Sequence, residues 1–425
     1  MGEQGLGKTT LVREFIKNKK CFYYGLHRTL EQLNCHLFLQ EAQLQGWAEE
    51  QYTWQGVLNK LARRARGESL VLVLDNCEHL ASCMPCLLEE LVQLLKTREN
   101  LRLFVLLVGE LAGEAWPLEL RKQANLELEL GPLTYLEALP LLEPFEEEEK
   151  VLLYGMTGGY PAYLALVDTK QSCKENVQRL FFGEQAPLAL AAENLLQRKL
   201  REPATYQTIL YSIAQGAERL SIISQQVGME MNKLSKYMKT LVDLGLVCRI
   251  NPITNYKEKK QQKKTYYVLQ NSLLEFYYRF VLPYGGLLAL GRGNGVLRQQ
   301  VAPQLDSYLG RVFQRLCLQY CHTLAEREDF AFAYEALGYW WQEEGSLVES
   351  LLLALQKKKA CCMVCVWENG RTSMETLERL MQVSQALPPE EKYYLIFSRK
   401  RFQNNLLAYS AQQPNIRLIS LSYIK

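Results

Sequence analysis

The chain has 425 residues, of which 48% are hydrophobic and 22% are charged, and its formal net charge is +3. This length predicts roughly two to four domains, and the composition is that of a globular protein able to bury more than one core. The net charge is too small for this length to indicate any class of partner. Twelve cysteines without a repeated framework, beside four histidines, favour reduced structural thiols over a metal site.

No apolar run approaches the ~20 residues of a membrane span. Glycine-rich residues stand where a signal peptide would carry its apolar stretch. We therefore expect a cytoplasmic protein without a membrane partner.

The first residues, GEQGLGKTT, contain a phosphate-binding loop. Gly2, Gly7, Lys8 and Thr9 satisfy the pattern G-x-x-x-x-G-K-[ST], with an additional glycine at Gly5. In such a loop the backbone N–H groups surround phosphate oxygens, the helix N-terminus adds its dipole, and the lysine reaches the outer phosphates. The predicted nucleotide-binding residues of this segment are Gly2, Gly5, Leu6, Gly7, Lys8, Thr9 and Thr10. The alternative is a glycine-rich turn with an incidental lysine.

A phosphate-binding loop normally follows a buried strand, and no residues precede this one to form it. Two explanations stay open. Either the true start lies upstream of Met1, or the site is a degenerate copy.

The front third alternates strand and helix patterns, which predicts a doubly wound α/β domain with a parallel sheet. The residue patterns predict helices over 9–17 and 53–66 and strands over 21–26, 70–74, 101–109 and 126–134. The run over 70–74 is continuously apolar, as in a strand buried on both faces, and it ends in Asp75. This aspartate matches the Walker B position, where it would hold Mg²⁺ through water beside the Thr9 hydroxyl.

The order of motifs resembles prokaryotic ATPases of the AAA/STAND group. The matching segments are GEQGLGKTT, LDNCEHL and TGGYPAYL, the last with Gly158, Gly159 and Pro161. In that group a P-loop domain precedes a winged helix and a restriction-endonuclease-like domain. The resemblance implies ATP and Mg²⁺ as cofactors and Pro161 as a lid contact to the nucleotide. It implies a P-loop core over 1–135, a helical lid over 136–200, a winged helix over 201–270, a connector over 271–305 and a nuclease-like domain over 306–425.

One departure from this group concerns hydrolysis. The acidic residue that would follow the Walker B aspartate and polarise the attacking water is Asn76 here. Glu78, two positions further on, could replace it only if the strand end bends to present it. The catalytic candidates are therefore Asp75, Asn76 and Glu78, and we expect ATP binding ahead of fast turnover.

The region over 201–270 reads as helix, short helix, turn, helix and a two-stranded wing. A basic wing and helix could hold DNA phosphates without sequence specificity. The candidate DNA-contacting residues are Lys233, Lys236, Lys257, Lys259, Lys260, Lys263 and Lys264. The alternative is a solvated hairpin tip on a module that serves only to join domains.

The resemblance places nuclease positions in the tail, but the residues there cannot bind a metal. The positions of the aspartate, the strand glutamate and the lysine fall on Leu351, Val364 and Val366, and apolar side chains cannot ligate a hard cation. The nearby Glu349 does not restore the motif. We therefore expect an inactive domain.

The sequence is compatible with two functions of different classes. The first is a nucleotide-dependent switch that presents its tail to a protein partner that the sequence does not identify. The second is a degenerate, ATP-independent DNA-binding or scaffold protein.

Overall fold

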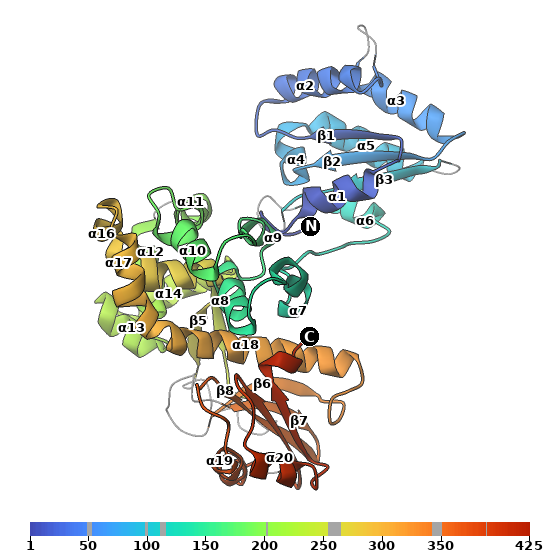
Figure 1. The fold of residues 1–425 in the computed structure, drawn as a ribbon. Helices are drawn as coiled ribbons and strands as arrows, with labels where there is room; N and C mark the ends of the chain where they lie inside the picture. The colour runs from blue at the N-terminus through green and yellow to red at the C-terminus, as the bar shows by residue number, and fades with distance from the viewer. Residues whose placement is uncertain are drawn as a thin grey trace. The chain divides into compact units, whose positions relative to one another are not determined.

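The structure is a computed structural model, and it describes all residues except 49–52, 98–100, 111–115, 201–202, 254–264, 342–350 and 388. The chain forms two compact units (Figure 1). The first contains Met1–Pro132 and Tyr160–Ala162, and the second contains Leu133–Gly159 and Tyr163–Lys425. Within the described residues, no helix is both long and apolar enough to cross a membrane.

The first unit is a three-layer α/β structure. Its elements are α1 (Lys8–Ile16), β1 (Cys21–Gly25), α2 (Glu31–Leu44), α3 (Trp54–Ala65), β2 (Leu70–Asp75), α4 (Leu80–Cys83), α5 (Pro85–Lys96), β3 (Leu103–Leu107) and α6 (Leu118–Gln123). The strands pair in parallel in the order β1-β2-β3. Every residue of β2 is buried, because helices cover both faces of the central strand.

Each face of this sheet has its own apolar core. On one face, Leu70, Leu72 and Leu74 pack with α2, α3 and α5. On the other face, Val71 and Val73 pack with Val12 of α1. The alternation of side chains along a strand thus sends neighbouring residues of β2 to opposite layers.

The expected strand over 126–134 is wrong. Leu126 and Leu128 are exposed, and the segment bonds to Met1 instead of to β3, with Leu130 N–H donating to Met1 O at 2.7 Å. The Gly2 N–H in turn donates to Gly109 O at 3.3 Å. The segment is extended, but the structure gives it no ladder of strand hydrogen bonds.

The second unit begins with helices and ends with a sheet. Its helices are α7 (Tyr135–Ala138), α8 (Glu147–Thr157), α9 (Pro161–Leu164, whose first two residues lie in the first unit), α10 (Cys173–Val177), α11 (Pro187–Lys199), α12 (Pro203–Ala214), α13 (Leu220–Val227), α14 (Met231–Asp243), α15 (Ser272–Phe276), α16 (Gly285–Ala289), α17 (Gly293–Val296), α18 (Leu305–Glu326), α19 (Met374–Ser384) and α20 (Asn404–Ser410). Its strands are β4 (Val247–Ile250), β5 (Tyr266–Leu269), β6 (Ala336–Trp340), β7 (Leu351–Gln356), β8 (Lys359–Val366), β9 (Glu391–Ser398) and β10 (Ile416–Ser420). As predicted, α13 and α14 flank a turn at Gly228 and precede the antiparallel pair β4–β5.

The carboxyl-terminal sheet is mixed, with strand order β10-β9-β8-β7-β6. Strands β8, β9 and β10 are parallel, whereas β6 and β7 join antiparallel. One face packs on α18 through Cys361 and Met363, and the other packs on α19 and α20 through Cys362. The mixed α/β class expected from the sequence is confirmed.

Helices α8 and α18 approach closely at a glycine. A Cβ built on Gly155 would lie 2.8 Å from Val312 Cγ2. Beside it, the buried Tyr308 hydroxyl donates a hydrogen bond to the Gly155 carbonyl at 2.6 Å. The absence of a side chain at Gly155 therefore sets the distance between the two helices.

We expect Gly155→Ala to lower the free energy of unfolding of the second unit by about 1–3 kcal/mol, because the added methyl group overpacks the contact with Val312. Urea unfolding followed by tryptophan fluorescence measures this change. Gly295→Ala is the matched control, since a Cβ there meets open space. Equal unfolding midpoints for the two variants would contradict the expected contact.

Candidate functional site

The segment before α1 is a tight loop built on two glycines. Gly5 and Gly7 have φ of 87° and 82°, a left-handed conformation in which a side chain would be strained. The first turn of α1 closes with Leu11 N–H donating to Gly7 O at 2.9 Å. The helix N-terminus is thus directed toward the loop, where its dipole favours an anion.

Lys8 folds back over this loop. Its Nζ donates to Gly2 O at 2.6 Å and to Glu3 O at 2.7 Å. These two carbonyl oxygens hold the ammonium group against the loop. A phosphate group would offer the same ammonium a charged acceptor, which makes a stronger hydrogen bond than a carbonyl.

Asp75, at the end of β2, accepts hydrogen bonds on both carboxylate oxygens. Thr9 Oγ1 donates to Oδ2 at 3.0 Å, the Tyr23 hydroxyl donates to Oδ2 at 2.7 Å, and Asn76 N–H donates to Oδ1 at 2.9 Å. The residue is 6% exposed, so these donors replace water. Burial, and then the bond to Asp75, raise the pKa of Tyr23 above its ordinary value.

Asn76 bridges the ends of two strands. It has φ of 58°, in the left-handed region that asparagine tolerates. Its Nδ2 donates to Leu26 O at 3.1 Å, just beyond β1. This geometry commits the Asn76 side chain to the strand β1.

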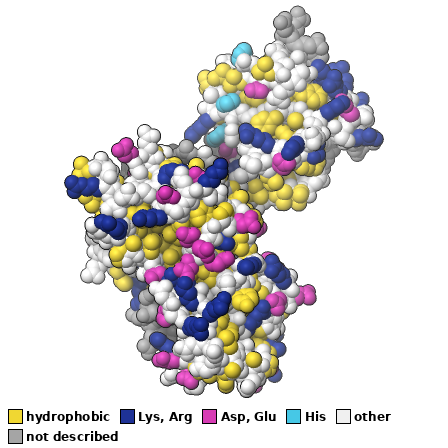
Figure 2. All heavy atoms as spheres, viewed as in Figure 1, with side chains coloured by type: hydrophobic (Ala, Val, Ile, Leu, Met, Phe, Trp, Pro, Cys, Tyr) yellow, Lys and Arg dark blue, Asp and Glu magenta, His cyan; other side chains and the backbone are white. Residues whose placement is uncertain are grey.

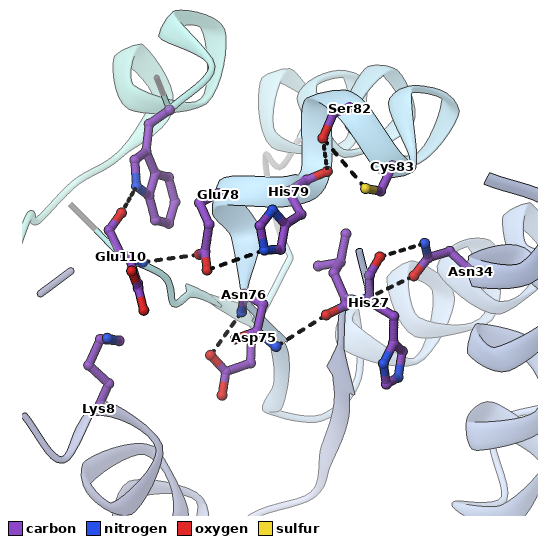
Figure 3. A network of polar contacts seen from close by, with 12 residues as sticks. Lys8, His27, Asn34, Asp75, Asn76, Glu78, His79, Ser82, Cys83 and Glu110 are labelled. Atoms are coloured by element: carbon purple, nitrogen blue, oxygen red, sulfur yellow. Dashed lines mark hydrogen bonds and ion pairs between the residues drawn. The ribbon is translucent and has the colours of Figure 1, made fainter. Parts of the chain in front are cut away.

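Glu78 lies against the end of β3. Its Oε2 accepts from the Glu110 N–H at 3.0 Å, and a Cβ on Gly109 would come within 2.3 Å of the same oxygen. Its Oε1 is 3.8 Å from His79 Nε2. The glycine therefore admits the carboxylate to a position beneath the strand end (Figure 3).

The three residues Tyr160–Ala162 pack on the loop. Ala162 N–H donates to Gly5 O at 3.0 Å, and the Tyr160 hydroxyl donates to Glu3 Oε2 at 2.6 Å. Pro161 Cβ is 3.7 Å from a Cβ built on Gly7. The segment containing Pro161 thus contacts the phosphate-binding loop directly.

The oxygen atoms of Thr9 and Asp75 suit Mg²⁺. A hydroxyl and a carboxylate are hard donors, and the cation usually keeps several water molecules beside one or two protein carboxylates. Bound there, Mg²⁺ would neutralise phosphate charge.

Most predicted site residues gather around the N-terminal end of α1. These are Gly2, Gly5, Leu6, Gly7, Lys8, Thr9, Asp75 and Pro161, whereas the Thr10 side chain is exposed on α1. Lys233 and Lys236 lie in the second unit, on α14. Lys257, Lys259, Lys260, Lys263 and Lys264 fall outside the described residues.

The sequence did not identify Tyr23, Tyr160 or Glu110 as site residues. Tyr23 pairs with Val73 in the parallel register that also places Gly25 beside Asp75. Tyr23 is a residue with a hydroxyl, two positions before the end of the strand that pairs with the strand of Asp75. This placement is a weak sequence signal for a contact to Asp75.

Comparison with known proteins supports a nucleotide-binding unit. Residues 1–113 match a family model described as AAA domain, and residues 277–379 match a family of archaeal and bacterial proteins of unknown function. A relative named uncharacterized protein MJECL04, from Methanocaldococcus jannaschii, is 24% identical over 414 residues, covering 94% of this chain and 90% of the relative.

Two solved structures are similar to parts of the chain. The Walker-type ATPase PABY2304 of Pyrococcus abyssi is 14% identical with a TM-score of 0.43, covering 65% of this chain and 89% of its own. Cdc6p from Pyrobaculum aerophilum is 12% identical with a TM-score of 0.34, covering 69% and 86%. From the family match and the loop geometry, the first unit contains a P-loop domain similar to the AAA domain of ATPases.

We expect Tyr23→Phe to reduce the free energy of unfolding of the first unit by about 1.5–3 kcal/mol, the usual value of a hydrogen bond to a charged group. Asp75 would lose the hydroxyl donor that lies 2.7 Å from its Oδ2. Urea unfolding without Mg²⁺ or nucleotide measures the loss, with Tyr409→Phe, at an exposed tyrosine, as control. An unchanged midpoint would show that the hydroxyl does not support the carboxylate.

Proposed function

We propose that this protein is a nucleotide-dependent switch that binds Mg-ATP and hydrolyses it slowly. The observation that carries the proposal is the meeting of Lys8, Thr9 and Asp75 at the start of α1. The lysine and the loop N–H groups would hold the phosphates, and Thr9 and Asp75 would hold Mg²⁺. The AAA-domain match over 1–113 does not favour an ATP-independent scaffold.

The switching part of the proposal rests on the segment Tyr160–Ala162. Its chain neighbours on both sides, Gly159 and Tyr163, belong to the second unit, yet its own contacts are to the loop. Phosphates bound by the loop would lie near this segment, since Ala162 N–H donates to Gly5 O and Pro161 lies beside Gly7. A change in its position would pass through the chain into α8 and α9, as the helical lid over 136–200 requires.

Slow hydrolysis is proposed because Asn76 occupies the position that normally carries an acid, and its side chain is already used in a hydrogen bond to another strand end. The Asn76 amide is hydrogen-bonded to Leu26 O, and an amide is a poor acceptor of a proton from water. Slow hydrolysis would keep the nucleotide bound for a long time, as a switch requires.

The carboxyl-terminal region over 306–425 is proposed to be a packing or interaction domain related to nucleases but inactive. The ends of β8 and β9 are filled by stacked side chains. Trp367 packs on Phe313 with ring centroids 5.2 Å apart, and the Arg399 guanidinium lies 4.7 Å from the Trp367 ring. Glu148 of α8 then pairs with Arg399 and Lys400. Glu349 lies outside the described residues.

Non-specific DNA contact by a winged helix over 201–270 is the second candidate. The observation that favours it is the exposed row Lys233, Lys236 and Lys239, spaced at helical intervals on α14 after the turn at Gly228. On the face seen in Figure 2, the Lys and Arg side chains among the described residues occur in separate groups with acidic groups between them.

Lys8→Ala is expected to weaken Mg-ATP binding by about 10- to 150-fold, the equivalent of one charge-assisted hydrogen bond. Titration calorimetry of the full chain measures the change. Lys17→Ala is the control, because this lysine is exposed at the other end of α1 and pairs only with Glu14 among the described residues. Equal affinity in the Lys8 and Lys17 variants would refute the proposed nucleotide site.

Replacing Lys233, Lys236 and Lys239 together by alanine is expected to weaken DNA binding and to reduce the slope of log affinity against log salt by up to ~3, about one per phosphate contact. Fluorescence anisotropy on duplexes of two unrelated sequences measures both quantities. The control removes three exposed lysines elsewhere in the second unit, Lys170, Lys357 and Lys358. The same slope in both triple variants would exclude α14 as the contact.

A further inference from the structure

The backbone of Glu110 is fixed from both sides just beyond β3. Its N–H donates to Glu78 Oε2 at 3.0 Å, and its carbonyl accepts from Trp116 Nε1 at 2.9 Å. Two residues earlier, the Val108 N–H donates to Leu74 O in β2, and the Val108 carbonyl accepts from the Cys77 N–H just after β2. With the peptide groups held in this way, the direction of the Glu110 side chain is set by the fold.

That position lies next to the phosphate-binding loop. Gly109 O accepts from Gly2 N–H at 3.3 Å, and Gly2 O accepts from Lys8 Nζ at 2.6 Å. Glu110 is therefore one residue away from a backbone group that touches the loop beneath the Lys8 ammonium. In Figure 3 the Glu110 carboxylate points toward the side on which Lys8 lies.

Glu110 also differs from the other acidic and amide groups nearby in being free to act. Asp75 accepts on both oxygens, Asn76 is bonded to Leu26, and Glu78 is bonded to the Glu110 N–H. Within the part of the chain that the structure describes, no side chain or backbone group donates a hydrogen bond to the Glu110 carboxylate. It is thus the available proton acceptor beside the loop.

We propose that Glu110 is the general base for ATP hydrolysis, in the role that Asn76 does not fill. This inference rests on the proposed function, since it requires ATP on the loop. The oxygen of a water molecule forms a bond to the γ-phosphorus while its proton passes to the Glu110 carboxylate. The bond between the γ-phosphorus and the β–γ bridging oxygen breaks, and its electron pair stays with ADP, so ATP and water give ADP and inorganic phosphate.

The test compares Glu110→Gln with wild type in two measurements. Single-turnover hydrolysis of Mg-ATP is expected to slow by about 10²–10⁴-fold, the usual contribution of a general base. Calorimetry is expected to find ATP bound about two- to fivefold more tightly and ADP bound equally, because the variant removes a negative charge beside the γ-phosphate alone. A purely structural role of Glu110 would not distinguish the two nucleotides.

Two further variants make the comparison specific. Glu90→Gln removes the same charge at an exposed site on α5 and should hydrolyse ATP at the wild-type rate. Glu78→Gln keeps an oxygen that accepts from the Glu110 N–H, so its loss of rate should be smaller than that of Glu110→Gln.

The outcomes separate this inference from the proposed function. Wild-type protein that fails to bind Mg-ATP would defeat both. Binding without hydrolysis in wild type, a wild-type rate in Glu110→Gln, or a larger loss in Glu78→Gln would each overturn the role of Glu110 while leaving ATP binding intact. An equal gain in ATP and ADP affinity would also overturn it, because it would make Glu110 a counterion of Lys8.

Discussion

A buried carboxylate needs hydrogen-bond donors, and in the first unit the donors for Asp75 come from three directions. Thr9 arrives from α1, Tyr23 from β1, and the Asn76 N–H from the chain just after β2. Because α1 begins at Lys8, holding Thr9 also holds the end of the phosphate-binding loop. The hydrogen bonds that satisfy this one carboxylate thus bring the loop, the helix N-terminus and the strand ends together in a single site.

The same arrangement sets a cost for occupying the site. In the proposed function, Mg²⁺ held by Thr9 and Asp75 would compete with the Thr9 and Tyr23 hydroxyls, which already donate to Asp75 Oδ2. Acidic side chains also lie in this part of the unit, with Glu3 in the loop and Glu78 hydrogen-bonded to the Glu110 backbone after β3. In the proposed function, Mg²⁺ bound with the nucleotide would offset the repulsion between these carboxylates and the phosphates.

The parts of the site that could be predicted from the sequence are those fixed by spacing along the chain. The loop pattern places Gly7, Lys8 and Thr9, and the apolar run of β2 places Asp75. Tyr23 and Glu110 depend instead on the parallel registers that align Gly25 with Asp75 and Leu107 with Leu74, which no local pattern encodes. The strand predicted over 126–134 is wrong for the opposite reason, because there the local pattern was present and the long-range pairing was not. Alternating leucines favour a strand, but the segment gained neither a partner strand nor burial.

These registers also explain how residues other than the one after Asp75 come to lie at the same edge of the sheet. In a parallel sheet the carboxyl ends of β1, β2 and β3 meet at one edge, so a side chain from any of them can reach the same space. Asn76 adopts a left-handed conformation and turns to the β1 side, and Glu78 passes beneath β3 because Gly109 has no side chain. Both residues after β2 thus serve to brace the neighbouring strand ends. The bracing fixes the backbone of Glu110 and leaves its carboxylate, one strand away, facing the loop.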